Sequence, residues 1–313
     1  MAQTRAKLLR FLTWSTIVIT AAIITIAAAY FPYDVDEPLT AAKSEEVRQY
    51  YAEAYKQEAV AYQEGPAESD TKYLRAATDA ADAAGITRQV SSFAATYGLE
   101  RAPVLDVGSG RGYLQDVVPN YTGLDISTNV SSFYHKRFVL GSATAMPFPD
   151  NSFGGGWSIW VLEHVPNPEQ ALVEIRRVMK NDAVLFLYPA WNCSELAAEG
   201  YRVRPYSDFG WQGKLVKAVS PARDSAFFRV AARIPSRMVR NVASHFGSTR
   251  LHYRLLRPNY KEYWEPDSDA LNAIDRYEMM LWFRSRGDEC LNCAGVEGSV
   301  LMKSSPLMIR IRK

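Results

Sequence analysis

A short apolar run followed by three closely spaced glycines constrains the fold of this chain most. The segment, residues 102–127, reads APVLDVGSGRGYLQDVVPNYTGLDIS. Gly108, Gly110 and Gly112 let the backbone turn sharply and let a ligand approach the main chain without a Cβ in the way. The second apolar run ends at Asp125, and a carboxylate at the end of a neighbouring strand can accept hydrogen bonds from ribose hydroxyls. The two features predict a nucleoside-bearing ligand at the carboxyl ends of parallel strands.

Two other nucleotide-binding loops do not fit this segment. The glycines are separated by single residues, whereas a dinucleotide site carries the spacing G-x-G-x-x-G. The Lys-Ser/Thr ending of a phosphate-binding loop is absent. A nicotinamide-dependent oxidoreductase is therefore disfavoured.

The pattern of the surrounding chain predicts an α/β fold. Between residues 102 and 189, short apolar runs alternate with helical stretches such as NPEQALVEIRRVMK. This alternation is typical of a parallel sheet covered by helices on both faces. Residues 41–97 are rich in alanine and predict two or three helices. Residues 267–287 read as a further helix, and the terminal PLMIRIRK reads as a closing strand.

Four ordered motifs in this region resemble the class I S-adenosylmethionine-dependent methyltransferases, in particular their small-molecule, methyltransferase type 11-like branch. They are VLDVGSGRG, GLDIS, GSATAMPFPDNSF and WVLEHVPNPEQALVEIRRVMK, and the resemblance covers about residues 102–190. It implies a Rossmann-like, seven-stranded, mostly parallel sheet with an antiparallel C-terminal strand. It also implies S-adenosyl-L-methionine as the cofactor.

The resemblance assigns cofactor-binding residues in three groups. Those at the glycine loop, beside the methionine and ribose portions, are Asp106, Gly108, Ser109 and Gly110; those after the second strand, at the ribose, are Asp125 and Ile126; those near the adenine are Ser142, Ala143 and Met146. The chain also departs from the family pattern. Ser142 stands where many relatives carry an acidic residue, and Gly154 begins a Gly-Gly-Gly run where an Asp is usual. The interval between Asp125 and Gly141 is short, so the second helix should be abbreviated.

Glu163 and His164 follow the predicted fourth strand and are the candidate catalytic residues. Histidine titrates near neutrality, so His164 could act as the base for an alcohol acceptor. The alternative is that the pair organises the loop and caps the next helix. No metal site is expected, because Cys290 and Cys293 form a C-x-x-C without a histidine at ligand spacing. Structural thiols or a local disulfide explain that pair better.

The first 31 residues predict a membrane anchor. Arg5, Lys7 and Arg10 precede 21 uncharged residues, FLTWSTIVITAAIITIAAAYF, and a helix crossing a bilayer needs roughly 20 such residues. The main alternative is a secretory signal peptide, although the apolar run exceeds the usual length. Three Lys or Arg precede the anchor and two, Lys43 and Arg48, follow it. By the positive-inside rule this small bias would export the catalytic domain. We nevertheless expect the catalytic domain to face the cytoplasm, where the cofactor is made.

Residues 201–260 carry twelve Lys or Arg against two acidic residues. Such a stretch suits an anionic membrane surface or a phosphate-bearing substrate. A solvated lid over the acceptor pocket is the alternative, and nucleic acid is less attractive because no binding module is recognised.

The predicted organisation has five parts. They are an anchor (1–31), a helical segment (32–100), the cofactor-binding core (101–200), a basic insertion or lid (201–265) and a C-terminal helix and strands that complete the sheet (266–313). We expect a membrane-anchored methyltransferase that O-methylates a glycan, a lipid-linked sugar or another small acceptor. The alternative is a methyltransferase-like binding or scaffold protein with a degenerate cofactor site.

Overall fold

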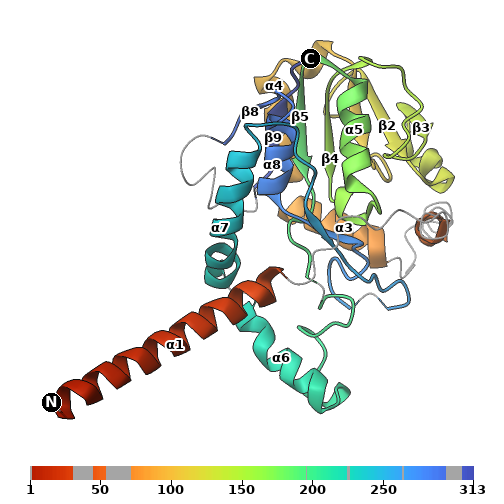
Figure 1. The fold of residues 1–313 in the computed structure, drawn as a ribbon. Helices are drawn as coiled ribbons and strands as arrows, with labels where there is room; N and C mark the ends of the chain where they lie inside the picture. Colours follow the sequence, from red (N-terminus) through yellow and green to blue (C-terminus); the bar gives the residue numbers. More distant parts are fainter. Residues whose placement is uncertain are drawn as a thin grey trace.

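One seven-stranded mixed sheet forms the centre of the protein (Figure 1). The structure, a computed structural model, describes residues 2–30, 45–53, 72–194, 196–223, 226–262, 264–293 and 305–313. The strands are β1 (Val104–Val107), β2 (Tyr121–Asp125), β3 (Arg137–Leu140), β4 (Phe153–Ile159), β5 (Met179–Tyr188), β8 (Glu289–Cys290) and β9 (Leu307–Arg310). Their order is β3-β2-β1-β4-β5-β9-β8. The first five strands pair in parallel, and β9 is antiparallel to both β5 and β8. The predicted Rossmann-like sheet with an antiparallel C-terminal strand is confirmed.

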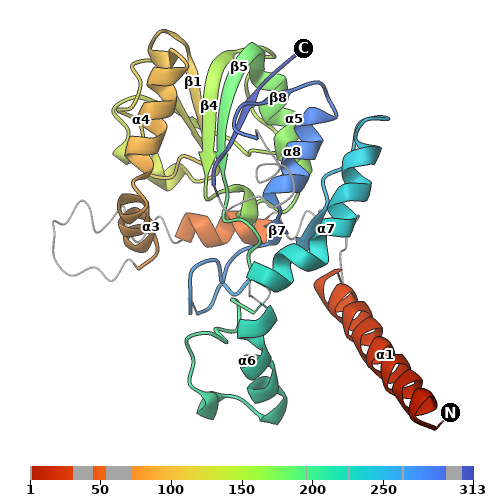
Figure 2. The same ribbon diagram turned by 90° about the vertical axis from the view of Figure 1, so that its left-hand side faces the viewer.

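Helices cover both faces of this sheet (Figure 2). Helix α4 (Ile86–Thr96) packs on one face, where it contributes Val90 and Phe93 to a core cluster shared with β1, β4 and β5. On the other face, α5 (Pro168–Val178) and α8 (Arg276–Arg284) contribute to a second cluster. The helices expected between residues 41 and 97 are confirmed in 45–53, α3 (Lys72–Ala83) and α4.

The glycine run in β4 allows close packing of that strand. A Cβ added at Gly154, Gly155 or Gly156 would lie 2.9 Å from Ala102 Cβ, 2.6 Å from Leu99 Cδ2 and 2.6 Å from Leu105 O, respectively. These distances are shorter than a carbon contact can be without displacement of the neighbour. The departure from the family pattern at these positions therefore reflects how tightly β4 approaches the residues before and within β1.

The connection between β2 and β3 is as short as expected. A six-residue 3₁₀ segment, η2 (Thr128–Phe133), stands in place of a full helix. The Ser127 side chain caps it by accepting a hydrogen bond from Asn129 N.

The C-terminal helix is shorter than the sequence predicts. Residues 267–275 are not helical, and α8 begins only at Arg276. Part of the preceding segment forms β7 (Asn272–Ile274), which pairs with β6 (Tyr253–Leu255) in a separate two-stranded sheet. Pairing with a distant strand thus overrides the local helical pattern, and Asp275 becomes the helix N-cap by accepting a hydrogen bond from Tyr277 N.

The basic region forms α6 (Trp211–Arg223) and α7 (Ala226–Ala243). Two of its arginines point inward, toward the segment that carries α8. Arg237 Nη2 lies 2.8 Å from Asp275 Oδ2, and Arg240 Nη2 lies 2.7 Å from Glu278 Oε2. These arginines therefore hold α7 against α8, and their side chains are committed to that contact instead of to an anionic surface.

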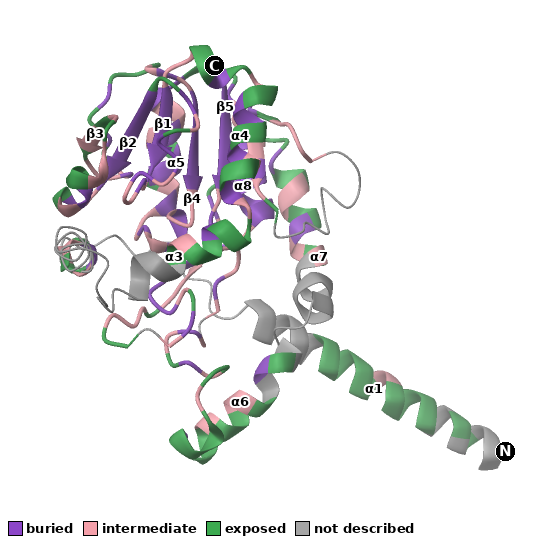
Figure 3. Cartoon of the chain, turned by 180° about the vertical axis from the view of Figure 1, so that it is seen from behind, coloured by how far each residue is buried: buried purple, intermediate pink, exposed green. Residues whose placement is uncertain are grey.

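Residues Ala2–Tyr30 form the helix α1, which extends away from the sheet (Figures 1 and 3). Its apolar side chains Phe11, Trp14 and Val18 are exposed. Among the helices that the structure describes, none combines the length and the apolar character needed to cross a membrane. The predicted transmembrane anchor in residues 1–31 is therefore not supported.

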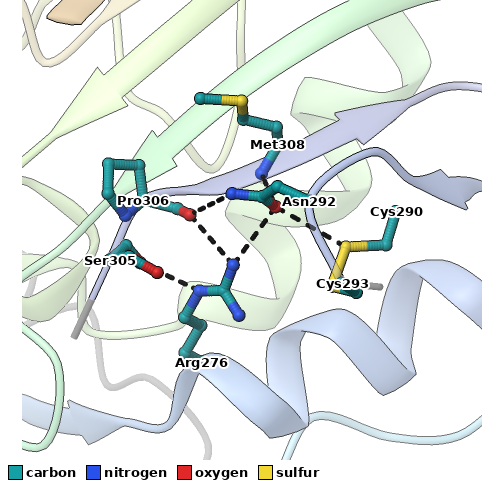
Figure 4. Close-up of a disulfide and its surroundings, with 7 residues drawn as sticks. All are labelled: Arg276, Cys290, Asn292, Cys293, Ser305, Pro306 and Met308. Carbon is teal, nitrogen blue, oxygen red and sulfur yellow. Dashed lines mark hydrogen bonds between the residues drawn. A yellow bond between two sulfur atoms is a disulfide. The ribbon is translucent and has the colours of Figure 1, made fainter. Parts of the chain in front are cut away.

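Cys290 and Cys293 form a disulfide at the end of β8 (Figure 4). Asn292, between them, donates from Nδ2 to Pro306 O and accepts at Oδ1 from Met308 N. Arg276 Nη2 donates to the same Oδ1. The local disulfide considered from the sequence is present, and its turn ties the start of β9 to the N-terminus of α8.

Candidate active site

A cavity of about 630 Å³ opens at the carboxyl ends of the parallel strands. Its volume falls in the range of small-molecule sites, roughly 300–1,000 Å³. The glycine loop, the ends of β2 and β3 and the segment after β4 contribute one side of the lining. Helical residues from the N-terminal segment, including Val47, Tyr51 and Ile86, contribute the other. None of the described residues in 201–265 lines the cavity, so the cover is N-terminal, and a lid role for the basic region stays a prediction.

The predicted glycine loop forms a tight turn against β2. Gly108, Gly110 and Gly112 have φ of 72°, 49° and 72°, a region that other residues rarely adopt. A Cβ at Gly108 would also lie 2.3 Å from Val161 Cγ1. Gly108 N donates to Leu124 O, so the loop stays close to the neighbouring strand. The loop thus exposes its backbone to the cavity, as the sequence predicts.

Asp125 connects this loop to the end of β2. Its Oδ2 accepts a hydrogen bond from Gly110 N at 2.9 Å, and its Oδ1 accepts one from Ser127 N at 3.0 Å. Both Asp125 and Ile126 line the cavity. Burial raises the pKa of Asp125, although the backbone N–H groups oppose this effect.

Asp106, near the end of β1, is also buried and accepts a hydrogen bond from Tyr121 Oη at 2.8 Å. Burial raises its pKa to about 7; the hydrogen bond from Tyr121 opposes the shift and the nearby Asp125 adds to it. The cavity therefore contains two buried carboxyl groups. An arrangement of this kind attracts a positively charged ligand when the groups are ionised.

The charge of Asp106 predicts a pH dependence for cofactor binding. The sulfonium of S-adenosylmethionine is permanently positive, whereas the thioether of S-adenosylhomocysteine is neutral. Below about pH 7 Asp106 gains a proton and the attraction for the sulfonium is lost. We expect the preference for S-adenosylmethionine to fall as pH decreases from 8 to 6, by at most about tenfold per pH unit.

Calorimetric titration of both ligands at each pH would measure this preference. Both ligands carry the same amino group, so its titration changes both dissociation constants equally and does not affect their ratio. The variant Asp106→Asn should give a ratio that no longer varies with pH. A ratio that varies equally in the variant would assign the dependence to another group.

The residues predicted near the adenine lie in two different places. Ser142 and Ala143 line the cavity, and Ser142 Oγ is 2.8 Å from Thr144 Oγ1 in the turn after β3. Met146 instead packs in the core cluster, and its backbone N–H donates to Glu174 Oε2. Of the residues at the glycine loop, Asp106, Gly108, Ser109 and Gly110 all line the cavity. The binding role of each remains a prediction.

Glu163 and His164 belong to the 3₁₀ segment η3 (Leu162–His164), which follows β4. His164 lines the cavity, whereas Glu163 is fully buried behind it and accepts a hydrogen bond from Ala190 N at Oε1. Burial raises the pKa of Glu163 to about 7. Burial alone would lower the pKa of His164, but the net direction is upward because carboxylates surround the ring, chiefly that of Asp269.

Several site residues escape prediction from the sequence. Asp269 Oδ2 lies 3.6 Å from His164 Nδ1 and accepts a hydrogen bond from Tyr51 Oη. Asp267 lies close to the same histidine. Trp160 lines the cavity with φ of 54°, a strained value for a bulky residue. No short-range spacing signals these residues, because they come from distant segments or depend on backbone strain.

Comparison with known proteins agrees with this geometry. A family model described as a methyltransferase domain matches residues 105–187. A fatty-acid O-methyltransferase of Mycolicibacterium smegmatis is 28% identical over 194 residues, which cover 55% of this chain and 69% of the relative. A sterol 24-C-methyltransferase of Gibberella zeae is 33% identical over 101 residues, covering 27% of each chain. The present chain thus spans about two thirds of the first relative and about a quarter of the second.

Among solved structures, an amino pentose methyltransferase from Micromonospora echinaspora is 16% identical, with a TM-score of 0.32. The match covers 34% of this chain and 51% of that protein, a likeness too low to bear on function.

The fold, the glycine loop and the family match define a class I S-adenosylmethionine-dependent methyltransferase domain. The chain is accordingly a small-molecule methyltransferase that uses S-adenosyl-L-methionine as its cofactor.

Proposed function

We propose that this enzyme transfers a methyl group to an oxygen of an apolar, lipid-like small molecule. The observation that carries the proposal is the apolar lining of the cavity beyond the glycine loop. That lining includes Val47, Ala81, Ile86, Trp160, Val161 and Val165. Apolar walls of this kind favour an acceptor that buries hydrocarbon surface.

The similarity to a fatty-acid O-methyltransferase supports an acidic or hydroxyl oxygen as the methyl acceptor. Methyl transfer from a sulfonium depends mainly on holding that oxygen in line with the methyl group. His164 faces the cavity and is the candidate to contact the acceptor end. The glycan and lipid-linked sugar acceptors expected from the sequence fit this apolar lining less well. The cytoplasmic location of the catalytic domain stays a prediction from the sequence.

Incubation of the full chain with methyl-labelled S-adenosylmethionine would test the proposal. The acceptors would be a long-chain fatty acid, a long-chain alcohol, a sterol and a sugar, with products identified by mass spectrometry. Formation of a methyl ester or methyl ether of a long-chain acceptor is the expected result. Methylation of the sugar alone would contradict the apolar acceptor, and methylation at a sterol carbon would contradict oxygen as the acceptor atom.

A further inference from the structure

Four side chains meet at the wall of the cavity, which His164 lines, and we call them the acidic cluster: Glu163, His164, Asp267 and Asp269. Two come from η3 and two from the segment before β7. Backbone contacts bring these segments together, because Leu271 N donates to Glu163 O at 2.9 Å. Asn272 Nδ2 donates to both Leu162 O and Val165 O. The cluster is therefore held by two well-anchored segments.

The ligand-type atoms of this cluster lie close together. One atom each from Glu163, His164 and Asp267 lie within 4.8 Å of one another. Asp269 Oδ2 is 3.6 Å from His164 Nδ1. Three ligands that share one ion at roughly 2.0–2.2 Å lie at most about 3.8 Å from one another when their separations are equal. The three side chains would therefore have to move together by up to about 1 Å for coordination.

Several atoms of the cluster have no hydrogen-bond partner among the described residues. The buried atoms without a partner are Glu163 Oε2, His164 Nδ1 and Asp269 Oδ1. The side chains of Glu163 and Asp269 are 0% and 1% exposed. Buried polar atoms normally find partners, and a buried charge without one is costly. Tyr51 Oη occupies only the other oxygen of Asp269. These unpartnered atoms leave coordination positions available.

The charges of the cluster also favour a cation. Three carboxyl groups face one imidazole. The positive charge of Arg202 also acts on Asp267. The Arg202 side chain is half exposed, however, and its Nε lies 3.9 Å from Glu265 Oε2. We propose that the acidic cluster binds a divalent metal ion. Three carboxylates and one imidazole suit a cation such as Mn²⁺ or Zn²⁺, which accepts both oxygen and nitrogen ligands.

The use of this ion in catalysis rests on the proposed function. A carboxylate acceptor that approached His164 would otherwise meet the negative charge of the cluster. A bound cation reverses the local charge and can hold the acceptor oxygen. An oxygen lone pair then forms the bond to the methyl carbon, and the carbon–sulfur bond breaks with its electron pair going to sulfur. The products are a methyl ester and neutral S-adenosylhomocysteine; no proton moves, and the metal keeps its oxidation state. In this arrangement His164 is a metal ligand and not a base.

Titration of the chelator-stripped full chain with Mn²⁺, followed by calorimetry and by the electron paramagnetic resonance signal of free Mn²⁺, tests the site. We expect one ion per chain, and we expect Asp267→Asn and His164→Asn each to weaken binding by at least about tenfold. Asp116→Asn is the matched control, because Asp116 is an exposed carboxylate outside the cluster. S-adenosylhomocysteine affinity, measured in parallel, should be unchanged in Asp267→Asn and Asp116→Asn, and thermal unfolding checks that all three variants are folded.

The metal site is overturned if the chain binds none of Mn²⁺, Zn²⁺ and Mg²⁺ stoichiometrically. It is also overturned if Asp267→Asn and His164→Asn both retain metal binding. Methyl-transfer assays separate this inference from the proposed function. A loss of transfer in EDTA that added Mn²⁺ restores supports the catalytic ion. Full transfer in EDTA overturns it and leaves the proposed function standing. Stoichiometric binding that is lost in Asp267→Asn supports the metal site even if no lipid-like acceptor is methylated.

Discussion

Replacing Asp125 by alanine should weaken S-adenosylmethionine binding about 10- to 150-fold. This range corresponds to roughly 1.5–3 kcal/mol, the contribution of a hydrogen bond to a charged group. Asp125 lines the cavity at the end of β2, where it can accept from ribose hydroxyls. It also accepts from Gly110 N and Ser127 N, so its loss releases the glycine loop as well. Calorimetric titration of the full chain would measure the change.

The matched control for this variant is Asp116→Ala. Asp116 is an exposed carboxylate that pairs with His135 on the surface, and its removal should leave cofactor affinity unchanged. Thermal unfolding of both variants checks that they are folded. A folded Asp125→Ala protein with an unaltered dissociation constant would remove Asp125 from the cofactor site.

Replacing Asp275 by alanine should lower the free energy of unfolding by about 3–5 kcal/mol, as when one partner of a buried ion pair is deleted. Its carboxylate lies 2.8 Å from Arg237 Nη2, and the two side chains are 14% and 7% exposed. The same carboxylate caps α8 by accepting from Tyr277 N. The variant therefore leaves a buried guanidinium without this partner and removes the helix cap. Urea unfolding followed by tryptophan fluorescence would measure the loss.

Two further substitutions make this stability prediction specific. Asp275→Asn keeps an oxygen that can cap the helix. Its free energy of unfolding should therefore fall by about 1 kcal/mol less than that of Asp275→Ala. Glu289→Ala breaks an exposed pair with Arg312 and should leave stability nearly unchanged. Equal losses in Asp275→Ala and Glu289→Ala would show that the contact between α7 and α8 does not depend on the buried pair.

The parts of the site that the sequence predicted are those encoded in short segments. Gly108 and Gly110 adopt positive φ in the sharp turn that the glycines predicted, and Asp125 ends the neighbouring strand. The alternating pattern of the last residues predicted the strand β9, and the family resemblance implied its antiparallel pairing. Each of these features depends on a few consecutive residues, whose conformational preferences act locally.

Other predictions failed where packing outweighed local preference. The helix expected from residue 267 starts only at Arg276, because β7 pairs with β6. Arg237 and Arg240, taken from the sequence as part of a basic surface, lie in ion pairs with residues at or near the start of α8. The sequence shows how many basic side chains a segment carries, but the tertiary structure decides which partners they contact.

The sequence by itself determined the class of protein, the glycine loop after the first strand and the carboxylate at the end of β2. Only the tertiary structure placed Asp267 and Asp269 beside His164 and set the N-terminal helices over the cavity. The physical reason is the range of the interactions. Turns and strand periodicity depend on neighbouring residues, whereas the cluster depends on backbone hydrogen bonds between segments far apart in the chain.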